Sequence, residues 1–505
     1  MTQSNGRISA DMFEFVNLSS QIYDERPKTK PGGYFSDAFL RFKKNKSSVV
    51  AAFIIGFLVL FAVLSPIIST YTVNDKDDIY RNTPPYIRAI ADLNLGIFDG
   101  AAVFDSQNLR QITAYKAIAA ETGYNPIIGD IRERQYEERD RGEIVTVTRY
   151  SVRLNQYYMI GARTVNISYE EFERIQNWQS ETGIQVLLPY VEGVSATTAN
   201  NWYLTEKGEA VYDSDGNFIP NYSTDTQKAG PVSYNSLRIE GDDGSYVYSR
   251  DKSSSVVCRV CYYNYYQYLN DREPEHLMGT DAYGRDLFDA IGTGARFSLI
   301  FAVLVSAINL TIGAVYGAIQ GYYGGGVDLA MDRIADVLSG VPFIVVMTLF
   351  KLHLAERVGV VPSFLFAFVL TGWISMAALT RKQFYRFKSR EYVMAARTLG
   401  ASDRRLMFKH ILPNALGTIV TSSVLVIPGG ISSETTLTYL GIVNLSSVVG
   451  TSIGELMELG QNSMASAPHT MLFPALFISL LLISFNLFGN GLRDAFNPST
   501  RGAED

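Results

Sequence analysis

Apolar residues in this chain are gathered into long runs, and few folds can accommodate such runs. Residues 49–70 include no charged side chain, and a helix of that length crosses the roughly 30 Å of hydrocarbon in a lipid bilayer. Five further runs follow a long polar interval, at approximately residues 297–320, 335–350, 362–380, 414–442 and 471–490. Helices in soluble cores do not contain apolar segments of this length. The sequence therefore predicts an α-helical membrane protein with six transmembrane helices.

Basic residues beside these runs predict which side of the membrane they face. Four of them precede the first run: Arg41, Lys43, Lys44 and Lys46. A second basic segment, residues 381–409, follows the fourth run and holds nine Lys or Arg residues against only Glu391 and Asp403. Because Lys and Arg are enriched in cytoplasmic loops, both segments are predicted to be cytoplasmic. Six crossings then place residues 1–48 and 491–505 in the cytoplasm, and residues 1–48 are too long and polar for a cleaved secretory signal.

The polar interval between the first two runs, residues 71–275, is predicted to be an extracytoplasmic domain with its own core. Residues 143–154 alternate in polarity as a half-buried strand does. Ser168 and Glu171 have the spacing of a capping box that begins a helix over residues 168–180. Residues 202–220 predict a hairpin turning at Asp213, rather than a calcium loop, because the bidentate Glu of such a loop is not in place. We therefore expect a mixed α/β domain inserted between helices 1 and 2.

Cys258 and Cys261 are the only cysteines of the chain. A local disulfide between them can form in an oxidising compartment, although strand residues three positions apart point to opposite faces. A disulfide and two free thiols are equally open on the sequence alone. A zinc site would need a second pair of ligands, so we predict no metal site.

The basic segment contains a further pattern over residues 391–413, which we call the elbow. Residues 391–399 suit a helix, and Gly400 suits a turn. Ser402 suits the cap of a second short helix, which Pro413 is predicted to end. The elbow is therefore predicted to be a helix–turn–helix feature that stands out of the membrane on the cytoplasmic face.

The elbow resembles the coupling loop of the permease subunits of ATP-binding-cassette (ABC) importers. The pattern is carried by Ala395, Ala396, Gly400, Leu412 and Pro413. Met394 and His410 depart from it, since the family usually has Glu and an aliphatic residue at those places. Small side chains at the alanine pair let another surface approach the backbone closely, so the resemblance implies a docking site for an ATPase subunit.

Further short matches to the C-type permease subunits of dipeptide and oligopeptide importers lie within residues 38–66 and 274–502. They follow the order of that family, at residues 42–46, 276–286, 321–333, 434–441, 467–474 and 485–494. Residues 71–275 are the main departure, because these subunits usually have a much shorter first loop. The resemblance implies the type I ABC importer permease fold, with the permease core over residues 276–490 and the coupling loop within residues 381–413.

The resemblance also implies a function and partners. The chain would form half of a peptide-translocating pore with a homologous B-type permease, and two ATPase subunits would bind ATP and Mg²⁺. The chain itself has no GxxxxGK[ST] phosphate loop, so we expect a transport subunit without a cofactor or catalytic residues of its own. Residues expected to engage the ATPase, besides those of the pattern, are Glu391, Arg397, Arg404 and Arg405.

Three carboxylates are candidates for the substrate path. Glu434 lies within a predicted span, where a charge is costly unless it is paired or faces water. It either lines the path or forms a hydrogen bond between helices near the outer end, and we favour the second role. Glu455 and Glu458 are candidates to meet substrate at the outer mouth, in a glycine-rich segment that can be partly re-entrant.

Other functions are less well supported by the sequence. The same family includes permeases for nickel chelates and other small solutes. A membrane sensor would need a cytoplasmic signalling module, and a secondary transporter would show internal repeats. The net charge of −6 favours no nucleic-acid partner. For residues 71–275 we expect either docking of an extracytoplasmic peptide-binding protein or a simple lid.

Overall fold

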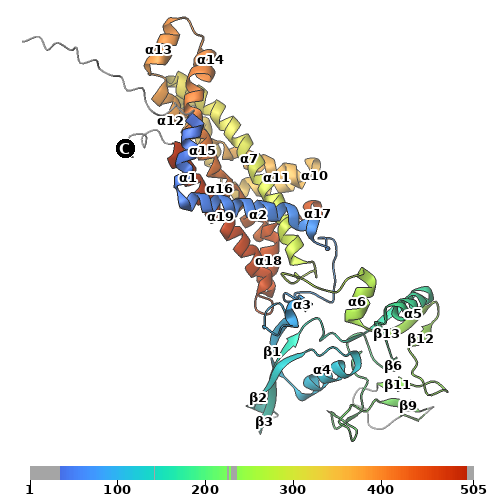
Figure 1. Cartoon of the computed structure of the whole chain (residues 1–505). Helices are drawn as coiled ribbons and strands as arrows, with labels where there is room; N and C mark the ends of the chain where they lie inside the picture. The colour runs from blue at the N-terminus through green and yellow to red at the C-terminus, as the bar shows by residue number, and fades with distance from the viewer. Residues whose placement is uncertain (1–33, 141–142, 225–226, 229–235, 497–505) are drawn as a thin grey trace, which may run out of the picture.

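The computed structural model describes residues 34–140, 143–224, 227–228 and 236–496. The predictions for residues 1–33 and 497–505 lie outside the described part of the chain. The described chain forms an elongated helical bundle with a mixed α/β region at one end (Figure 1). All described strands lie between helices α2 (Lys46–Ile68) and α7 (Leu287–Tyr323) in the sequence, so one insertion supplies the whole α/β region.

Five helices of the described chain are long and apolar enough to cross a membrane. They are α2, α7, the pair α11 (Val360–Gly372) and α12 (Ile374–Phe387), the continuous stretch Asp403–Tyr439, and α19 (His469–Phe496). A sixth is present if α8 (Gly325–Ser339) and α9 (Phe343–His353) count as one span. The chain is therefore a multi-pass membrane protein.

The predicted third span, residues 335–350, is wrong as a straight helix. Helices α8 and α9 meet at an angle of 73°, and the break falls at Gly340–Pro342, inside the predicted range. Pro342 is the N-cap of α9, where the missing N–H of proline costs no helical hydrogen bond. Residues 335–350 thus supply the end of one helix and the beginning of another.

Close helix packing holds the bundle together. Helix α2 follows α1 (Tyr34–Lys44) and lies against α7 and α19 (Figure 1). A side chain at Gly292 of α7 would collide with Ser65, and one at Gly491 of α19 would collide with Ser48. Small residues at helix crossings let backbones approach within a membrane, so these two glycines are required where they stand. Apolar side chains of the same helices form the core between them, among them Leu58, Ile291 and Leu481, and Ile431 of another helix joins them.

The described residues of the insertion form three small sheets and one two-stranded pair. The first sheet has the strand order β1 (Ala101–Gln107), β3 (Glu143–Asn155), β2 (Ile127–Asp140) and is packed beside α4 (Leu109–Thr122). The second joins β12 (Ser249–Lys252), β13 (Ser255–Cys261), β4 (Ala162–Ile167) and β5 (Leu187–Leu188). The third joins β10 (Gln227–Lys228), β9 (Tyr222–Thr224), β11 (Leu237–Ile239) and β6 (Val191–Glu192), and the pair is β7 (Thr205–Glu206) with β8 (Glu209–Ala210).

Local features of the insertion can be compared with their sequence signals. The alternating residues 143–154 form β3. Ser168 caps α5 (Tyr169–Thr182) by accepting a hydrogen bond from the backbone N–H of Glu171. The Glu171 carboxylate instead accepts from Tyr268 at 2.8 Å and pairs with Arg174 at 2.6 Å. The turn after Asp213 is present, because its carboxylate accepts the N–H groups of Asp215 and Asn217 at 2.9 and 2.8 Å.

The two cysteines are free and buried, so the disulfide considered above is not formed. Both lie on β13, where Cys258 pairs with Val165 and Cys261 with Ala162 of β4. The odd spacing sends them to opposite faces of the strand. Cys258 accordingly joins an apolar cluster with Ile175, whereas Cys261 joins a separate, tyrosine-rich cluster.

A hydrogen-bonded joint fixes the insertion to the beginning of α7. The hydroxyl groups of Thr83 and Thr280 lie 2.8 Å apart, and Thr280 donates to the carbonyl of Tyr80 at 2.6 Å. Tyr86 and His276 also exchange backbone hydrogen bonds. We refer to these contacts as the joint. Because they are buried, the insertion is packed firmly against residues 276–280, which lead into α7.

Candidate functional site

The elbow lies at the end of the bundle opposite the insertion (Figure 1). It begins with α13 (Glu391–Thr398), turns at Gly400 and continues into α14 (Asp403–Arg405). The backbone φ of Gly400 is +82°, a conformation that glycine adopts without steric cost. The predicted helix and turn are therefore both present.

The second half of the elbow differs from its prediction, because Pro413 does not end a helix. Helix α14 runs through a π-helical turn, Leu406–Ile411, directly into α15 (Leu412–Val424). In this wider turn the N–H of Leu412 bonds the carbonyl of Met407, five residues earlier. Pro413 then occupies the first turn of α15, where its missing N–H is tolerated. Ser402 occupies the predicted N-cap position of α14 but makes no side-chain capping bond there.

An apolar cluster gives the elbow its own small core. Val393, Leu406 and Ile411 are buried with Phe384 of α12, and Ala396 packs against the same cluster. Ala395, by contrast, is exposed. The two alanines therefore differ, since the Ala396 side chain packs against the elbow core and the Ala395 side chain faces outward. Leu399 is 88% exposed and presents an apolar side chain that the sequence reasoning did not single out.

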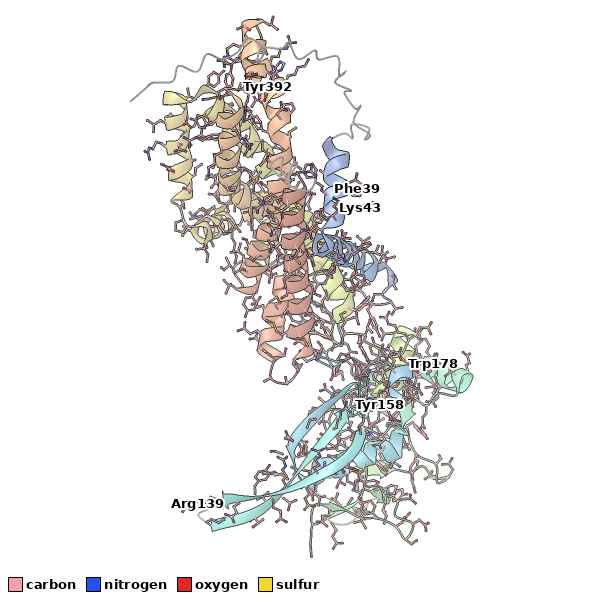
Figure 2. The ribbon with its side chains drawn as sticks, turned by 60° about the vertical axis from the view of Figure 1, so that its left-hand side comes forward. Phe39, Lys43, Arg139, Tyr158, Trp178 and Tyr392 are labelled. Carbon is pink, nitrogen blue, oxygen red and sulfur yellow. The ribbon has the colours of Figure 1, made fainter. Side chains whose placement is uncertain are left out.

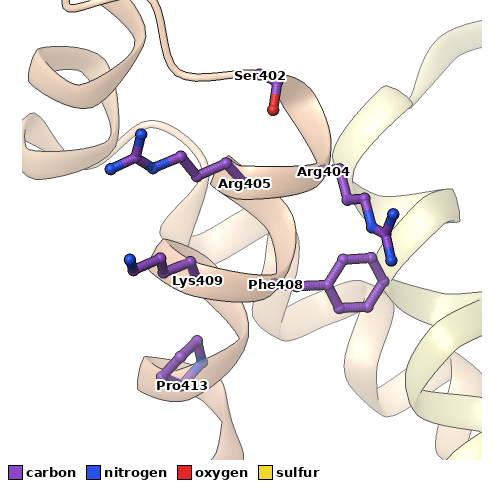
Figure 3. Close-up of a pocket in the computed structure, with 6 residues that line it drawn as sticks. All are labelled: Ser402, Arg404, Arg405, Phe408, Lys409 and Pro413. Carbon is purple, nitrogen blue, oxygen red and sulfur yellow. The ribbon is translucent and has the colours of Figure 1, made fainter.

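Basic side chains of the elbow fall into two groups. Arg397 is exposed but reaches α7, where it donates to the phenol oxygen of Tyr322 at 3.3 Å. Arg404, Arg405 and Lys409 surround a surface hollow of about 450 Å³ (Figure 3). Its other lining residues are Ser402, Phe408 and Pro413. No acidic residue of the described chain lines this hollow, so it presents positive charge around a small apolar floor.

An ion-pair network joins the broken span to α12. In the sequence, its acidic residues counted only toward the match to the permease family. Arg381 bonds Asp328 at 2.5 Å and Asp332 at 3.0 Å. Tyr385 donates a further hydrogen bond to Asp328 at 2.5 Å. Partial burial strengthens such pairs relative to exposed ones. The network therefore anchors α8 beside the helix that leads into the elbow.

Glu434 lies within α16 (Val426–Tyr439), and its side chain is fully buried. Ser298 of α7 donates to one carboxylate oxygen at 2.7 Å. The other oxygen, Oε1, has no hydrogen-bond partner among the described residues. This is the geometry of a hydrogen bond between two helices, the role we favoured from the sequence.

Glu455 and Glu458 lie on α18 (Ile453–Ser463), which follows the short α17 (Ser446–Val449). Burial raises the pKa of Glu455, and the nearby guanidinium of Arg285 opposes that shift. Arg285 itself pairs with Asp281 at 2.7 Å. Glu458 is only half-buried. Of the two candidates, Glu458 is therefore the one that a solute can reach in this chain without a rearrangement.

The segment around these carboxylates packs closely against neighbouring helices. A side chain at Gly454 would collide with Thr438 and the backbone of Thr435 of α16, and one at Gly460 would approach Thr470 of α19. The glycines therefore serve helix packing in this part of the chain. Among the residues that the structure describes, no group of three or more His, Cys, Asp or Glu could hold a metal ion.

Comparison with known proteins gives two family matches. Residues 310–502 match the family described as the binding-protein-dependent transport system inner membrane component. Residues 33–85 match the N-terminal TM domain of oligopeptide transport permease C. Neither match includes residues 86–309, which contain most of the insertion and most of α7.

Several curated proteins are similar to this chain. The oligopeptide transport system permease protein OppC of Bacillus subtilis is 39% identical over 233 residues, which are 46% of this chain and 75% of that protein. The dipeptide transport system permease protein DppC of the same organism is 37% identical, covering 45% and 70%. OppC of Escherichia coli K12 is 35% identical, covering 46% and 75%.

Solved structures of lower similarity were also found. The MetNI methionine ABC transporter in an inward facing conformation has 13% identity and a TM-score of 0.34, and it covers 41% of this chain and 96% of its own. An amino acid ABC transporter has 13% identity and a TM-score of 0.33, with coverage of 41% and 93%.

Proposed function

The chain belongs to the family of binding-protein-dependent transport system inner membrane components, and we propose that it is the permease subunit of an ATP-driven importer for oligopeptides or dipeptides. Its similarity to permeases named for oligopeptide and dipeptide transport supports this substrate class. A permease for nickel or another small solute is not favoured by these relatives. A membrane sensor has no comparable support.

One observation carries the proposal, namely that the elbow and the insertion lie at opposite ends of the bundle (Figure 1). The basic residues of the elbow favour the cytoplasmic side. The insertion then lies on the extracytoplasmic side, and both ends of the chain lie in the cytoplasm. We propose this orientation for a cytoplasmic membrane.

The proposed complex is a heterodimer of permeases with two ATPase subunits and a soluble peptide-binding protein. The pore lies between this chain and the homologous B-type permease. ATP and Mg²⁺ bind to the ATPases, and this chain supplies no ATP site of its own. The exposed Ala395 and Leu399 enter a groove of one ATPase, while Arg404 and Arg405 pair with acidic groups at its rim.

Movement of the ATPases is transmitted through packed helices. The elbow core includes Phe384 of α12 and Tyr322 of α7, so displacement of the elbow displaces those helices with it. Rigid-body rearrangements of this kind open a pore alternately to either side. Glu434 contributes by fastening α16 to α7, and Glu458 is the better placed of the two α18 carboxylates to meet a peptide amine.

Reconstitution tests the proposal. The chain should co-purify with a second permease and two ATPases, and peptide-loaded binding protein should stimulate ATP hydrolysis in proteoliposomes. An Ala395→Cys variant should react with a membrane-impermeant maleimide in inverted vesicles but not in intact cells. Labelling from outside intact cells would overturn the orientation. Isolation as a lone active carrier would overturn the importer assignment.

A further inference from the structure

A second hollow, separate from that of the elbow, lies in the insertion beside the joint. Its volume is about 440 Å³, which is within the range of roughly 300–1,000 Å³ found for pockets that bind small molecules. Tyr86 and Tyr158 line it, and Tyr86 also belongs to the joint through its backbone hydrogen bonds with His276. Figure 2 shows Tyr158 in the part of the insertion near the helical bundle, whereas Arg139 lies at the far end of the β2–β3 ribbon. We call this hollow the insertion pocket.

The insertion pocket forms where β2 leaves its partner strand. The pairing of β2 with β3 is interrupted between Ile128 and Arg132, and Gly129 has a φ of +73° at that break. Irregularities of this kind bend a strand and are common beside binding sites. The segment that follows α3 (Arg88–Ala91) closes the other side, because residues 91–99 supply further lining side chains. The fold of the sheet therefore creates the pocket.

Three charged residues line the insertion pocket, and they leave it with an excess of negative charge. Arg153 pairs with Asp99 at 2.7 Å, so those two charges balance. Arg153 also donates to the carbonyl oxygen of Gly96 at 3.0 Å. The third charged residue is Asp92, whose carboxylate makes no hydrogen bond or ion pair with the residues that the structure describes. This uncompensated carboxylate makes the pocket selective for a cation.

Hydrogen-bond donors stand beside that carboxylate. Arg153 uses only its Nη2 group in the contacts above, so its other N–H groups can donate to a ligand. The side-chain oxygen of Asn125 accepts from the backbone N–H of Ile127 at 3.0 Å, which leaves the amide N–H groups of Asn125 to donate. A free carboxylate next to unused donors matches the amino end of a peptide, where an ammonium group adjoins a carbonyl oxygen. A metal ion fits less well, since the described chain offers no group of three or more His, Cys, Asp or Glu ligands.

A more open hollow adjoins the insertion pocket and shares Asn125 and Gly129 with it. Its charged lining residues are Lys116 and Asp130, whose charges cancel. It therefore imposes no preference for charge on what lies in it. A peptide held by its amino end in the insertion pocket can extend over this second hollow, and its side chains need not be of one kind.

We propose that the insertion pocket binds the amino end of a short peptide, with the α-ammonium group at Asp92 and the first carbonyl oxygen at Arg153. This inference rests on the proposed importer function, and it gives the permease a peptide site of its own within the insertion. Because Tyr86 belongs to both the pocket and the joint, a peptide bound there lies next to the residues that lead into α7. The insertion then takes part in the capture of substrate.

The test measures equilibrium binding of tetra-alanine amide to the complete reconstituted transporter in the absence of the binding protein. The amino end is the only charged group of this peptide. Asp92→Asn should weaken its binding at least about fivefold, because the variant removes the charge but keeps the size of the side chain. Acetylating the amino end of the peptide should weaken binding to the unmodified protein by a similar factor. It should have little further effect on Asp92→Asn, since the two changes remove the same interaction.

The matched control is Asp242→Asn, which makes the same substitution at an exposed position elsewhere in the insertion and should leave the affinity unchanged. Co-purification of the ATPase subunits checks that each variant assembles. An equal loss of affinity in Asp242→Asn would show a general effect of charge on the insertion and would reject the assignment to this pocket. If propylamine competes as well as the peptide does, the pocket recognises an amine alone and the peptide assignment is wrong.

The remaining outcomes separate this inference from the proposed function. If the unmodified complex shows no ATP hydrolysis stimulated by peptide-loaded binding protein, the importer function is wrong. If stimulation is present but the unmodified complex binds no tetra-alanine amide, the role of the insertion pocket is wrong. The same conclusion follows if Asp92→Asn binds that peptide as tightly as the unmodified protein does.

Discussion

The phenol of Tyr322, in the last turn of α7, donates a 2.6 Å hydrogen bond to the carboxylate of Asp403, the first residue of α14. Arg397 of α13 reaches the same phenol oxygen, so one side chain of α7 contacts both halves of the elbow. The opposite end of α7 begins at the joint with the insertion. A single helix therefore runs between the elbow and the insertion.

Removing that phenol oxygen should loosen the elbow without unfolding the chain. Tyr322→Phe deletes a hydrogen bond to a carboxylate that is exposed to solvent, so the expected loss is about 1 kcal/mol. Hydrogen exchange of residues 391–413 should accelerate, and peptide uptake per ATP hydrolysed should fall. Tyr323→Phe is the matched control, since Tyr323 is half exposed on the same turn. Unchanged exchange in Tyr322→Phe would contradict the link.

The alanine pair should respond unequally to a large charged side chain. Ala395→Arg adds bulk on the exposed side of α13, so the subunit should assemble while ATP hydrolysis becomes uncoupled from uptake. Ala396→Arg forces a charge against the elbow core and should also lower the amount of folded protein, by a penalty of about 1–3 kcal/mol. Expression, uptake and ATPase activity of both variants check this, with Ala395→Ser as control. Normal transport in Ala395→Arg would reject docking at this site.

Glu434 is expected to fasten helices rather than to carry substrate. Glu434→Gln keeps an acceptor for Ser298 and should preserve both folding and uptake. Glu434→Leu leaves the Ser298 hydroxyl unpaired and should reduce thermal stability, by about 1 kcal/mol for a hydrogen bond between membrane helices. Ser298→Ala should reproduce part of that loss. Abolished uptake in a stably folded Glu434→Gln protein would instead place the carboxylate on the substrate path.

Local signals in the sequence were sufficient for part of the site. The helix of residues 391–398 and the turn at Gly400 follow from intrinsic preference, because only glycine adopts φ of +82° cheaply. Strand β3 follows from alternation of polarity in the same way. Such features depend on neighbours in the sequence, so tertiary packing did not have to be known.

Other features depended on contacts between distant residues. A proline such as Pro413 ordinarily predicts the end of a helix. Here a π-helical turn before it accommodates the missing N–H group. No local sequence pattern predicts such a turn. Whether Ala395 or Ala396 faces outward was decided by Phe384 on another helix. The bend at Pro342 was missed because apolarity alone does not distinguish one straight helix from two. The part of the β2–β3 ribbon that extends beyond β1 was not predicted, because the polarity of one strand does not tell which strands pair beside it.

The two cysteines should be slow to react in the folded protein. Burial raises the pKa of Cys258 to about 12 and that of Cys261 to about 11. Because only the thiolate is nucleophilic, alkylation near pH 8 should be slower by about 100-fold or more than for an ordinary thiol. Mass spectrometry after iodoacetamide treatment, before and after denaturation, checks this. An exposed Val145→Cys variant is the control. If the two cysteines of the denatured protein react only after a reducing agent is added, they form a disulfide and the prediction is wrong.

Glu455 should make the part of the bundle around α18 less stable as pH rises. Its carboxyl has a pKa raised by burial, so the folded state binds this proton more tightly than the unfolded state does. The associated stability is complete below the unfolded pKa of about 4.3 and is lost as pH rises through the folded value. Glu455→Gln cannot ionise and should therefore raise the melting temperature at pH 7.5 by about 1–3 °C, a gain that shrinks toward pH 4.5. Glu458→Gln changes the more accessible carboxylate of α18 and serves as the matched control. A destabilised Glu455→Gln at pH 7.5 would mean that the electrostatic attraction of the Arg285 guanidinium for the Glu455 carboxylate outweighs the cost of burial.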